Sequence, residues 1–582
     1  MSRTRGARLA DHGAIGDGAR GALIASDGRI DWYCPVGIDG PASLFRLVDD
    51  SRGGYVRFGP ATQGAPGDQS ADESGASILT TRLVDRGALL EITDHLERGR
   101  IVRMLTVLRG DVEVALDVRP GHAFAEPRKV ERWSDGIAFG SLIIRGAPAH
   151  ETIRMTAGER RVVTISTRTD VGVTRSGAEL EALTVDGALF EQTTLRRRSR
   201  VELDSVAFDG PMRPVLLRSI RALRMLTDPS TGALVRALTT SLPAWPGNER
   251  NIDERYAWLR DNAAAVQLYD DLECRSWAGA TRSWLADVAA TELPLSPAYR
   301  ANGDPLPSEV ELGLPGWDGN GPVRTGNAVA NAVDVGAMAA ASLVLDADTS
   351  WPTLERLGDW LAENWARADH GPWASRGPRR RHVEGVLAVR EALRALVRTA
   401  QRRNPLDPVV VQWVDAARSM DAWLATQGRF GREATTGWRR TDDDDTSDAA
   451  LLWQLFGTAP ELPDDVEGEA DDRRVTTLEQ TMAQLGEGPF VHRHLPHVDD
   501  GFPPGQAADL EASFSMVSAL TMMGRWEDAH DRMEAILGAL GPTGIGATHV
   551  DAVGGDLRGN LLAAPTHLAC ARAVLSLARG PR

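Results

Sequence analysis

The spacing of apolar residues changes once along the chain, near residue 211, and this change constrains the fold more than any other feature. Before it, "RVVTISTR" (161–168) and "VEVALDVRP" (112–120) alternate polar and apolar residues, as half-buried strands do. After it, "RPVLLRSIRALRML" (213–226) carries apolar residues at helical spacing. We therefore expect strands up to about residue 205 and helices from there on. The sequence predicts an antiparallel β-sandwich over 1–208 and a second, helical domain over 209–582.

The second half contains about a dozen helical segments by their start and stop residues. Examples are "TGNAVANAVDVGAMAAASLVL" (325–345), "EGVLAVREALRALVRTA" (384–400) and "ADLEASFSMVSALTMMG" (508–524). About twelve helices after a β domain suggest an α/α barrel, with six inner and six outer helices. The predicted fold class is multidomain α+β, and the loops at one end of the barrel should line a pocket.

Charge and composition exclude several classes of function. The 582 residues carry a formal net charge of −16, which disfavours a nucleic-acid partner. We find no apolar run long enough to cross a bilayer and no secretory signal, so we expect a cytoplasmic protein without membrane contact. Three widely spaced cysteines and the "HRHLPH" run (492–497) give no metal-ligand spacing, so neither a metal nor a cofactor is expected. The oligomeric state stays open, a homo-oligomer included.

Large aromatic and charged side chains gather in a few predicted loops. The stretches are "NIDERYAWLRDN" (251–262), "GWDGNGPVRTGN" (316–327), "GPWASRG" (371–377) and "RGNLLAAPTHLA" (558–569). Aromatic faces stack on the apolar face of a pyranose, and Arg and Asp hydrogen-bond to vicinal hydroxyls, so a pocket built from these loops suits a small-molecule sugar. The alternative is that each cluster caps a helix or pairs locally.

Several of these stretches resemble the motifs of glycoside hydrolase family 15, the glucoamylases and bacterial trehalase-like proteins. "IGDGARGALIASDGRIDWYCPVGIDGPASLF" (15–45) resembles the N-terminal signature of that family. "RYAWLRD" is similar to R-Y-x-W-L-R-D, and "GWDGNGPVRTGNA" to G-Y-x-G-S-x-P-V-R-I-G-N-A. The resemblance covers nearly the whole chain and implies a β-sandwich followed by an (α/α)6 barrel that takes an α-glucoside.

The resemblance also implies roles for single residues. Arg260 and Asp261 would hold hydroxyls of the innermost glucose unit, and Arg324 would do the same from the next loop. The full set of implied substrate-binding residues is Trp258, Arg260, Asp261, Trp317, Arg324, Trp373 and Arg376.

The catalytic positions of the family are substituted here. The family places its general acid in a G-I-W-E-x-R-G loop and its base in a G-L-L-x-E-E-x-D loop. The matching stretches are "GPWASRG" and "GIGATHVD" (544–551), which put Ala374 at the acid, and Thr548 and His549 at the two glutamates of the base loop. Inverting hydrolysis needs a carboxyl on each side of the scissile bond.

Four other residues are candidate replacements for the missing groups: Glu384, Asp318, Glu511 and His549. The alternative for each of these carboxylates is that it caps a helix or is a solvated surface charge. Two functions therefore stay open. The first is an enzyme acting on an α-glucoside of the trehalose or malto-oligosaccharide class with replaced catalytic groups. The alternative is an inactive or repurposed relative with a sugar-binding, regulatory or non-hydrolytic role.

Overall fold

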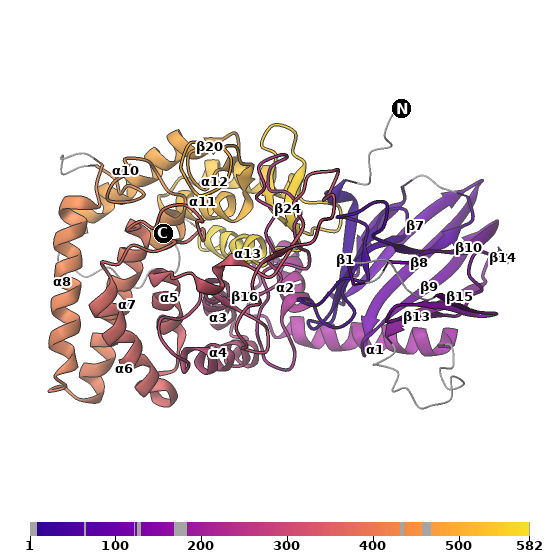
Figure 1. Cartoon of the computed structure of the whole chain (residues 1–582), viewed down its shortest axis with the longest axis horizontal. Helices are drawn as coiled ribbons and strands as arrows, with labels where there is room; N and C mark the ends of the chain where they lie inside the picture. Colours follow the sequence, from indigo (N-terminus) through magenta and orange to yellow (C-terminus); the bar gives the residue numbers. More distant parts are fainter. Residues whose placement is uncertain are drawn as a thin grey trace.

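The computed structural model describes residues 8–62, 66–121, 123–124, 130–167, 183–430, 436–456 and 467–580. Two bodies lie end to end, a β-sandwich and a helical barrel, drawn at the right and left of Figure 1. This is the predicted order of the two folds. No helix in the described part of the chain is long and apolar enough to cross a membrane.

The sandwich consists of two antiparallel sheets. The first has the strand order β1-β2-β3-β5-β10-β14, with β4 paired to β3; its strands are β1 (His12–Gly16), β2 (Gly21–Ala25), β3 (Arg29–Tyr33), β4 (Leu44–Phe45), β5 (Tyr55–Pro60), β10 (Asp111–Arg119) and β14 (Thr152–Thr156). The second has the order β11-β12-β13-β15-β9-β8-β7-β6; its strands are β6 (Asp68–Ala71), β7 (Ile78–Asp85), β8 (Ala88–Glu97), β9 (Arg100–Arg109), β11 (Val130–Trp133), β12 (Gly136–Phe139), β13 (Leu142–Arg145) and β15 (Arg160–Thr167).

Alternation along the strands builds the core between the two sheets. In β10, Val112, Val114, Leu116 and Val118 are buried while the residues between them are more exposed. They share one apolar cluster with side chains of the opposite sheet such as Leu105. The strand-like pattern predicted for this half thus comes from one buried face per strand.

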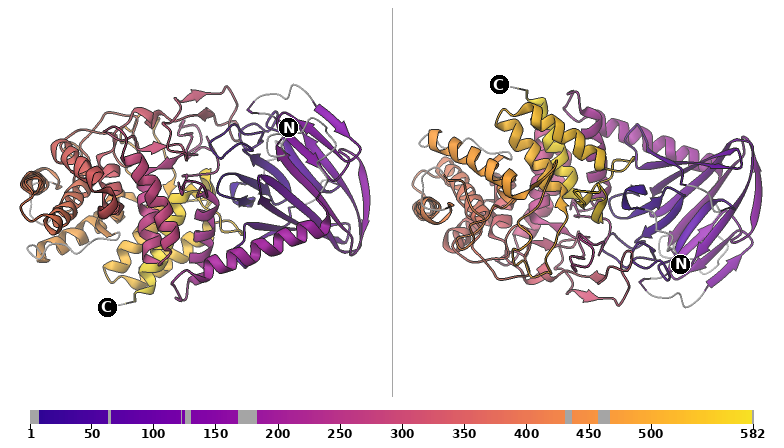
Figure 2. Two further views of the ribbon diagram at one scale, coloured as in Figure 1. Left: turned by 90° about the horizontal axis from the view of Figure 1, so that it is seen from below. Right: turned by 90° about the horizontal axis from the view of Figure 1, so that it is seen from above.

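The prediction of strands up to about residue 205 is wrong for its last part. Residues Val185–Asp204 form helix α1, whose first turn is capped by the Thr184 hydroxyl accepting from the Gly187 amide at 3.1 Å. Its buried Ala188, Gln192 and Leu195 recur at helical spacing. The helix lies against β9 and β15 and runs along the sandwich toward the barrel (Figure 2).

The helical domain is a closed ring of inner helices. Helix α3 contacts α5, and the contacts continue through α7, α9, α11 and α13 back to α3. Each inner helix also contacts an outer one, from α2, α4, α6, α8, α10 or α12. The described helices of the barrel are α2 (Arg213–Leu226), α3 (Leu259–Asp271), α4 (Arg275–Ala289), α5 (Val335–Val344), α6 (Ala347–Asn364), α7 (Val383–Arg403), α8 (Val409–Gln427), α9 (Ala450–Phe456), α10 (Glu467–Leu485), α11 (Leu510–Met522), α12 (Trp526–Ala539) and α13 (Ala564–Ala578). The six-hairpin barrel is confirmed.

The helix predicted over 325–345 is too long at its N-terminus. Helix α5 begins at Val335, because Asp334 is its N-cap and accepts from the Ala337 amide at 3.0 Å. Residues before it form a short strand and one 3-10 turn (Ala328–Asn331). The aspartate inside this Ala-rich run therefore starts the helix ten residues later than predicted. The residues before it form a loop at the mouth of the barrel instead of a helix.

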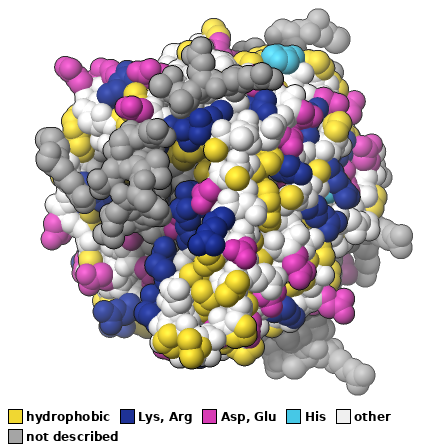
Figure 3. Space-filling model, turned by 90° about the vertical axis from the view of Figure 1, so that its left-hand side faces the viewer, with side chains coloured by type: hydrophobic (Ala, Val, Ile, Leu, Met, Phe, Trp, Pro, Cys, Tyr) yellow, Lys and Arg dark blue, Asp and Glu magenta, His cyan; other side chains and the backbone are white. Residues whose placement is uncertain are grey.

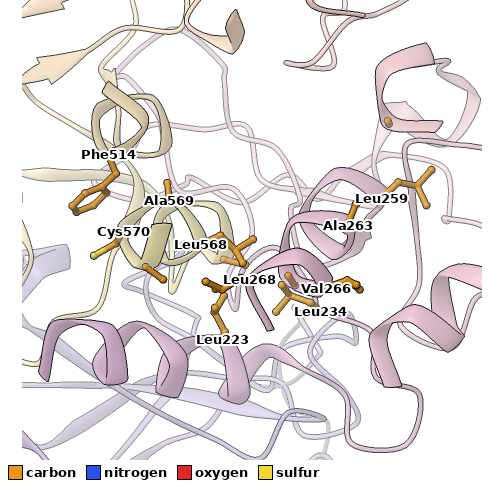
Figure 4. Packing of buried hydrophobic residues seen from close by; sticks show 14 of the residues in the cluster. Leu223, Leu234, Leu259, Ala263, Val266, Leu268, Phe514, Leu568, Ala569 and Cys570 are labelled. Atoms are coloured by element: carbon orange, nitrogen blue, oxygen red, sulfur yellow. The ribbon is translucent and has the colours of Figure 1, made fainter. Parts of the chain in front are cut away.

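Side chains from several helices meet in the barrel wall. Figure 4 shows Leu223 of α2, Leu268 of α3 and Leu568 of α13 converging between the helices. All three are buried in one apolar cluster. Close packing of this kind fixes the direction of each inner helix, and so the position of its first turn.

A small sheet closes one side of the barrel mouth. Its strands are β20 (Gly486–Glu487), β21 (Phe490–Val491), β22 (Ala508–Asp509), β23 (Ala547–Val550) and β24 (Leu557–Leu561), in sequence order. Asp509 of β22 pairs with His549 of β23, which pairs with Arg558 of β24. The sheet therefore brings together three segments that are up to about fifty residues apart.

Arg255 ties the barrel to the sandwich. Its guanidinium makes a two-point ion pair with Asp253, at 2.8 and 2.7 Å. It also donates to the carbonyls of Gly40 at 2.6 Å and Ile38 at 3.2 Å in the N-terminal domain. The side chains of Arg255 and Asp253 are almost completely buried, so this one cation satisfies acceptors of both domains.

Replacing Arg255 with alanine should therefore lower the free energy of unfolding by about 3–5 kcal/mol, because Asp253 would stay buried without a cationic partner. Urea unfolding followed by circular dichroism measures the loss. Arg300→Ala is the matched control, since Arg300 pairs with Asp39 of the same N-terminal segment but is 44% exposed. That change should cost less than about 1 kcal/mol. Equal losses in the two variants would contradict the role of Arg255.

Candidate functional site

A cavity of about 610 Å³ opens at the ends of the inner helices where the chain enters them. This volume is in the range of small-molecule sites. Among the residues that line it are Glu254, Trp258, Arg260, Asp261, Trp373, Ala374, Arg376, Glu511, Thr548 and His549. The structure thus brings together residues that are up to about three hundred positions apart, and five of the seven predicted binding residues are among them.

Arg260 lies in the first turn of α3 and joins three inner helices. It donates to both oxygens of Asp334, the N-cap of α5, at 2.7 and 2.7 Å. It also donates to both oxygens of Glu384, in the first turn of α7, at 2.7 and 2.9 Å. Burial would raise the pKa of Asp334, but the Arg260 guanidinium outweighs it and holds this pKa below its ordinary value. Arg260 is therefore both a wall of the cavity and a buried structural cation.

A glycine makes room for this cation. A Cβ atom at Gly336 would lie 2.2 Å from Nη2 of Arg260 and 3.2 Å from Oε2 of Glu384. Gly336 is in the first turn of α5, where alanine would otherwise be the better helix former. The glycine is explained by the close approach of the guanidinium rather than by the helix.

Asp261 points into the cavity from the next position on α3. Its two oxygens accept from Nε and Nη2 of Arg236, at 2.7 and 2.8 Å. The same guanidinium lies over the ring of Trp258, 3.9 Å from its centroid. Asp261 is thus held in one orientation, and each carboxylate oxygen keeps a further lone pair for a hydroxyl donor.

Trp373 is held by carboxylates that also cap helices. Its Nε1 donates to Asp448 at 2.8 Å, and Asp448 accepts from the Ala450 amide at the start of α9. Arg493 lies over the Trp373 ring, 4.8 Å from its centroid, and donates to Asp509, the N-cap of α11, at 2.7 Å. Both supports come from the N-terminal ends of inner helices.

Two of the predicted binding residues do not line the cavity. Arg324 is buried and donates to the backbone carbonyls of Glu249 and Asn251, at 2.8 and 3.1 Å. It shares Glu309 with Arg376, which does line the cavity, so Arg324 supports Arg376 from behind. Trp317 lies in the same loop under the Arg558 guanidinium, 5.9 Å from its ring centroid. Arg324 and Trp317 are therefore not among the residues that line the cavity, and their contact with a ligand stays a prediction.

The two positions matched to the catalytic glutamates both face the cavity. Ala374 lines it with a backbone φ of 52°, and its methyl group packs against the apolar cluster of Tyr256 and Trp258. Thr548 lines it from β23, and its hydroxyl is 2.8 Å from Nδ1 of His549. Neither position carries a carboxyl.

Of the four candidate replacements for the catalytic carboxyls, two line the cavity and two do not. Asp318 is exposed and does not line it. Glu384 does not line it either, and Arg260 occupies both of its oxygens. His549 lines it, but burial lowers its pKa well below the ordinary value, with Arg493 adding to the effect. A ring of such low basicity is a poor general base at neutral pH. Glu511 is the one candidate of the four that keeps a free carboxyl in the cavity.

One cavity carboxyl was missed in the sequence. Glu254 is buried and lines the cavity, where one of its oxygens accepts from Nδ2 of Asn560 at 2.8 Å. It lies directly before the Arg-Tyr pair of the "RYAWLRD" motif. The signal in the sequence is an ionisable residue directly beside this motif, but only the fold shows that its side chain faces the cavity.

The cavity continues toward the other end of the barrel. There its lining includes Arg390 and Arg394, which both donate to Asp421 of α8, and Arg572, which pairs with Asp271. The barrel face that α8 covers carries arginine side chains beside carboxylates (Figure 3). Among the described residues, no three or more His, Cys, Asp or Glu side chains form a group that could hold a metal ion.

Gly336→Ala should lower the free energy of unfolding by about 1–3 kcal/mol, because the new methyl group displaces the Arg260 guanidinium from its two carboxylates. Thermal unfolding measures the change. Gly279→Ala is the matched control, since it is also inside a helix but has nothing within 4 Å of the new Cβ. That variant should gain up to about 1 kcal/mol from helix propensity. A stabilised Gly336→Ala protein would contradict the packing argument.

Comparison with known proteins gives an independent view of the chain. Residues 210–490 match the model described as "Glycosyl hydrolases family 15". A trehalase of Mycolicibacterium smegmatis is 28% identical, over 98% of this chain and 91% of that protein. A trehalase of Thermoplasma acidophilum is 23% identical, over 94% of this chain and 97% of that protein.

Among solved structures, a bacterial glucoamylase complexed with acarbose superposes with a TM-score of 0.67 at 12% identity, covering 99% of this chain and 96% of that one. This likeness extends through both domains and supports the fold. The chain is therefore similar, over nearly its whole length, to the trehalases and glucoamylases of glycoside hydrolase family 15.

Proposed function

We propose that the cavity binds an α-glucoside of the trehalose or malto-oligosaccharide class and that the protein acts on it as a glycosidase. The observation that carries the proposal is that Trp258, Arg260 and Asp261, at the start of α3, line one cavity together with Trp373. The similarity to trehalases along the chain points to the same class of substrate.

The charges at the mouth suit a neutral polyol. Asp261 already neutralises Arg236, Asp509 neutralises Arg493, and two carboxylates neutralise Arg260. An anionic ligand would find no unpaired cation among these residues. Hydroxyl groups, which donate and accept, can bond to such fixed ion pairs without breaking them.

The proposed activity does not use the two positions of the family's acid and base. Ala374 has no proton to give, and the Thr548 hydroxyl is a very weak acid and base compared with a carboxyl. A non-hydrolytic, sugar-binding role is the second candidate function, and the missing carboxyls at these two positions are the observation that favours it.

Asp261→Asn should weaken binding of trehalose or maltose about tenfold or more, since a charged acceptor of hydroxyl hydrogen bonds becomes a neutral one. Isothermal titration calorimetry measures the affinity. Asp318→Asn is the matched control, because Asp318 is exposed and outside the cavity; its affinity should stay that of the wild type. If the wild type binds no α-glucoside, the proposed function is wrong. Arg260→Ala is unsuitable here, because it would leave two buried carboxylates unpaired.

Ala374→Gly and Thr548→Ser should each leave glucose release from trehalose and maltose within about threefold of the wild type, because neither side chain takes part in proton transfer, which is worth at least about 100-fold. Glycine accepts the positive φ at 374 without strain. A loss of ten-fold or more in Thr548→Ser would instead place the hydroxyl in the reaction.

A further inference from the structure

Two carboxyl groups at the cavity mouth are left without a cationic partner. Five arginines that line the cavity each form an ion pair with another Asp or Glu: Arg236, Arg250, Arg260, Arg376 and Arg493. Glu254 and Glu511 have no ion pair with any described residue. Keeping two acids in a cavity without an ion pair costs stability because their charged forms are desolvated there, and such acids are typical of functional sites.

Glu511 lies in the first turn of α11, directly beside the cavity. Its carboxyl makes no hydrogen bond with any described residue. The charged groups that act on it are Asp509 of its own helix cap, Asp261 of α3, Arg236 and Arg493. The neighbouring imidazole of His549 on β23 is neutral, because burial lowers its pKa.

Glu254 approaches from the segment before α3. The single hydrogen bond of its carboxyl group to a described residue comes from Asn560, and the second carboxyl oxygen is left for a ligand. Arg236 and Asp261 act electrostatically on Glu254 as they do on Glu511. Both free carboxyls are therefore close to Asp261, the residue assigned to the sugar hydroxyls.

We propose that Glu511 is the general acid and Glu254 the general base of glycoside hydrolysis in this cavity, replacing the carboxyls that are absent at positions 374 and 548. This assignment rests on the proposed function. As the bond from C1 to the glycosidic oxygen breaks, Glu511 gives its proton to that oxygen. Glu254 takes a proton from a water molecule whose oxygen forms the new bond to C1. Two free sugars leave, the configuration at C1 is inverted, and exchange with solvent resets both carboxyls.

The electrostatic environment fits this division of roles. Burial, reinforced by Asp509 and Asp261, raises the pKa of Glu511 to about 8, so the group is protonated at neutral pH. Burial also raises the pKa of Glu254, while Arg236 and the Asn560 amide favour its charged form. A carboxylate with a raised pKa is a stronger base than an ordinary one.

The test for the acid compares leaving groups. Glu511→Gln should lower glucose release from trehalose and maltose by about 100-fold or more, the usual worth of a general acid. The same variant should hydrolyse α-glucosyl fluoride within about fivefold of the wild type, because fluoride leaves without a proton. In the wild type, turnover of trehalose should fall as the pH rises through about 8, where Glu511 loses its proton, and Glu511→Gln should lack this alkaline limb.

The test for the base uses an external nucleophile. Glu254→Ala should lose about 100-fold or more on both trehalose and α-glucosyl fluoride. Azide should restore turnover of the fluoride by attacking C1 in place of the activated water, giving β-glucosyl azide. Glu292→Gln, an exposed carboxyl outside the cavity, is the matched control and should behave as the wild type throughout.

Calorimetry with trehalose separates failure of this assignment from failure of the proposed function. Sugar binding by each variant also shows that it is folded. A wild type that binds trehalose but hydrolyses neither trehalose nor the fluoride would overturn the assignment and leave the binding function intact. Variants that bind and keep wild-type turnover would also overturn it. A wild type that binds no α-glucoside would overturn both.

Discussion

The buried ion pairs of Arg260 determine the geometry of the barrel mouth. One guanidinium bonds to Asp334 and Glu384 and so fixes the first turns of α5 and α7 relative to α3. Removing this guanidinium would leave two largely buried carboxyl groups without a cationic partner, which is strongly destabilising. The pairs therefore hold three inner helices in register, and the neighbouring Asp261 is set in the cavity as a consequence.

The same principle recurs around the mouth. Carboxylates that start inner helices also orient the side chains of the site: Asp334 holds Arg260, Asp509 holds Arg493, and Asp448 holds Trp373. An acidic residue at a helix N-terminus is favourable because it bonds free amides and faces the positive end of the helix dipole. In this protein each of these carboxylates also bonds to a side chain of the site. The start of each helix and the geometry of the site therefore depend on the same atoms.

Much of the site could be predicted from the sequence, and the failures have a common cause. Trp258, Arg260, Asp261, Trp373 and Arg376 lie at the cavity as expected, because each is in a loop or first helical turn at the barrel mouth. Arg324 and Trp317 were expected there for the same reason, but Arg324 bonds to backbone carbonyls behind the cavity and Trp317 lies under the Arg558 guanidinium. Glu254 was overlooked, since its stretch reads equally well as a polar loop. Loop position is visible in a sequence, whereas side-chain direction within a loop is not.

The sequence by itself determined the two folds, their order and the family resemblance, because these follow from the period of the apolar residues and from local motifs. It also showed that positions 374 and 548 carry no carboxyl. Only the tertiary structure decided which acids form ion pairs. Glu384 pairs with Arg260, whereas Glu254 and Glu511 line the cavity without an ion pair to any described residue. The pairing of a charge depends on neighbours that are a hundred or more residues away in the chain, and these become neighbours only when the ring of inner helices closes.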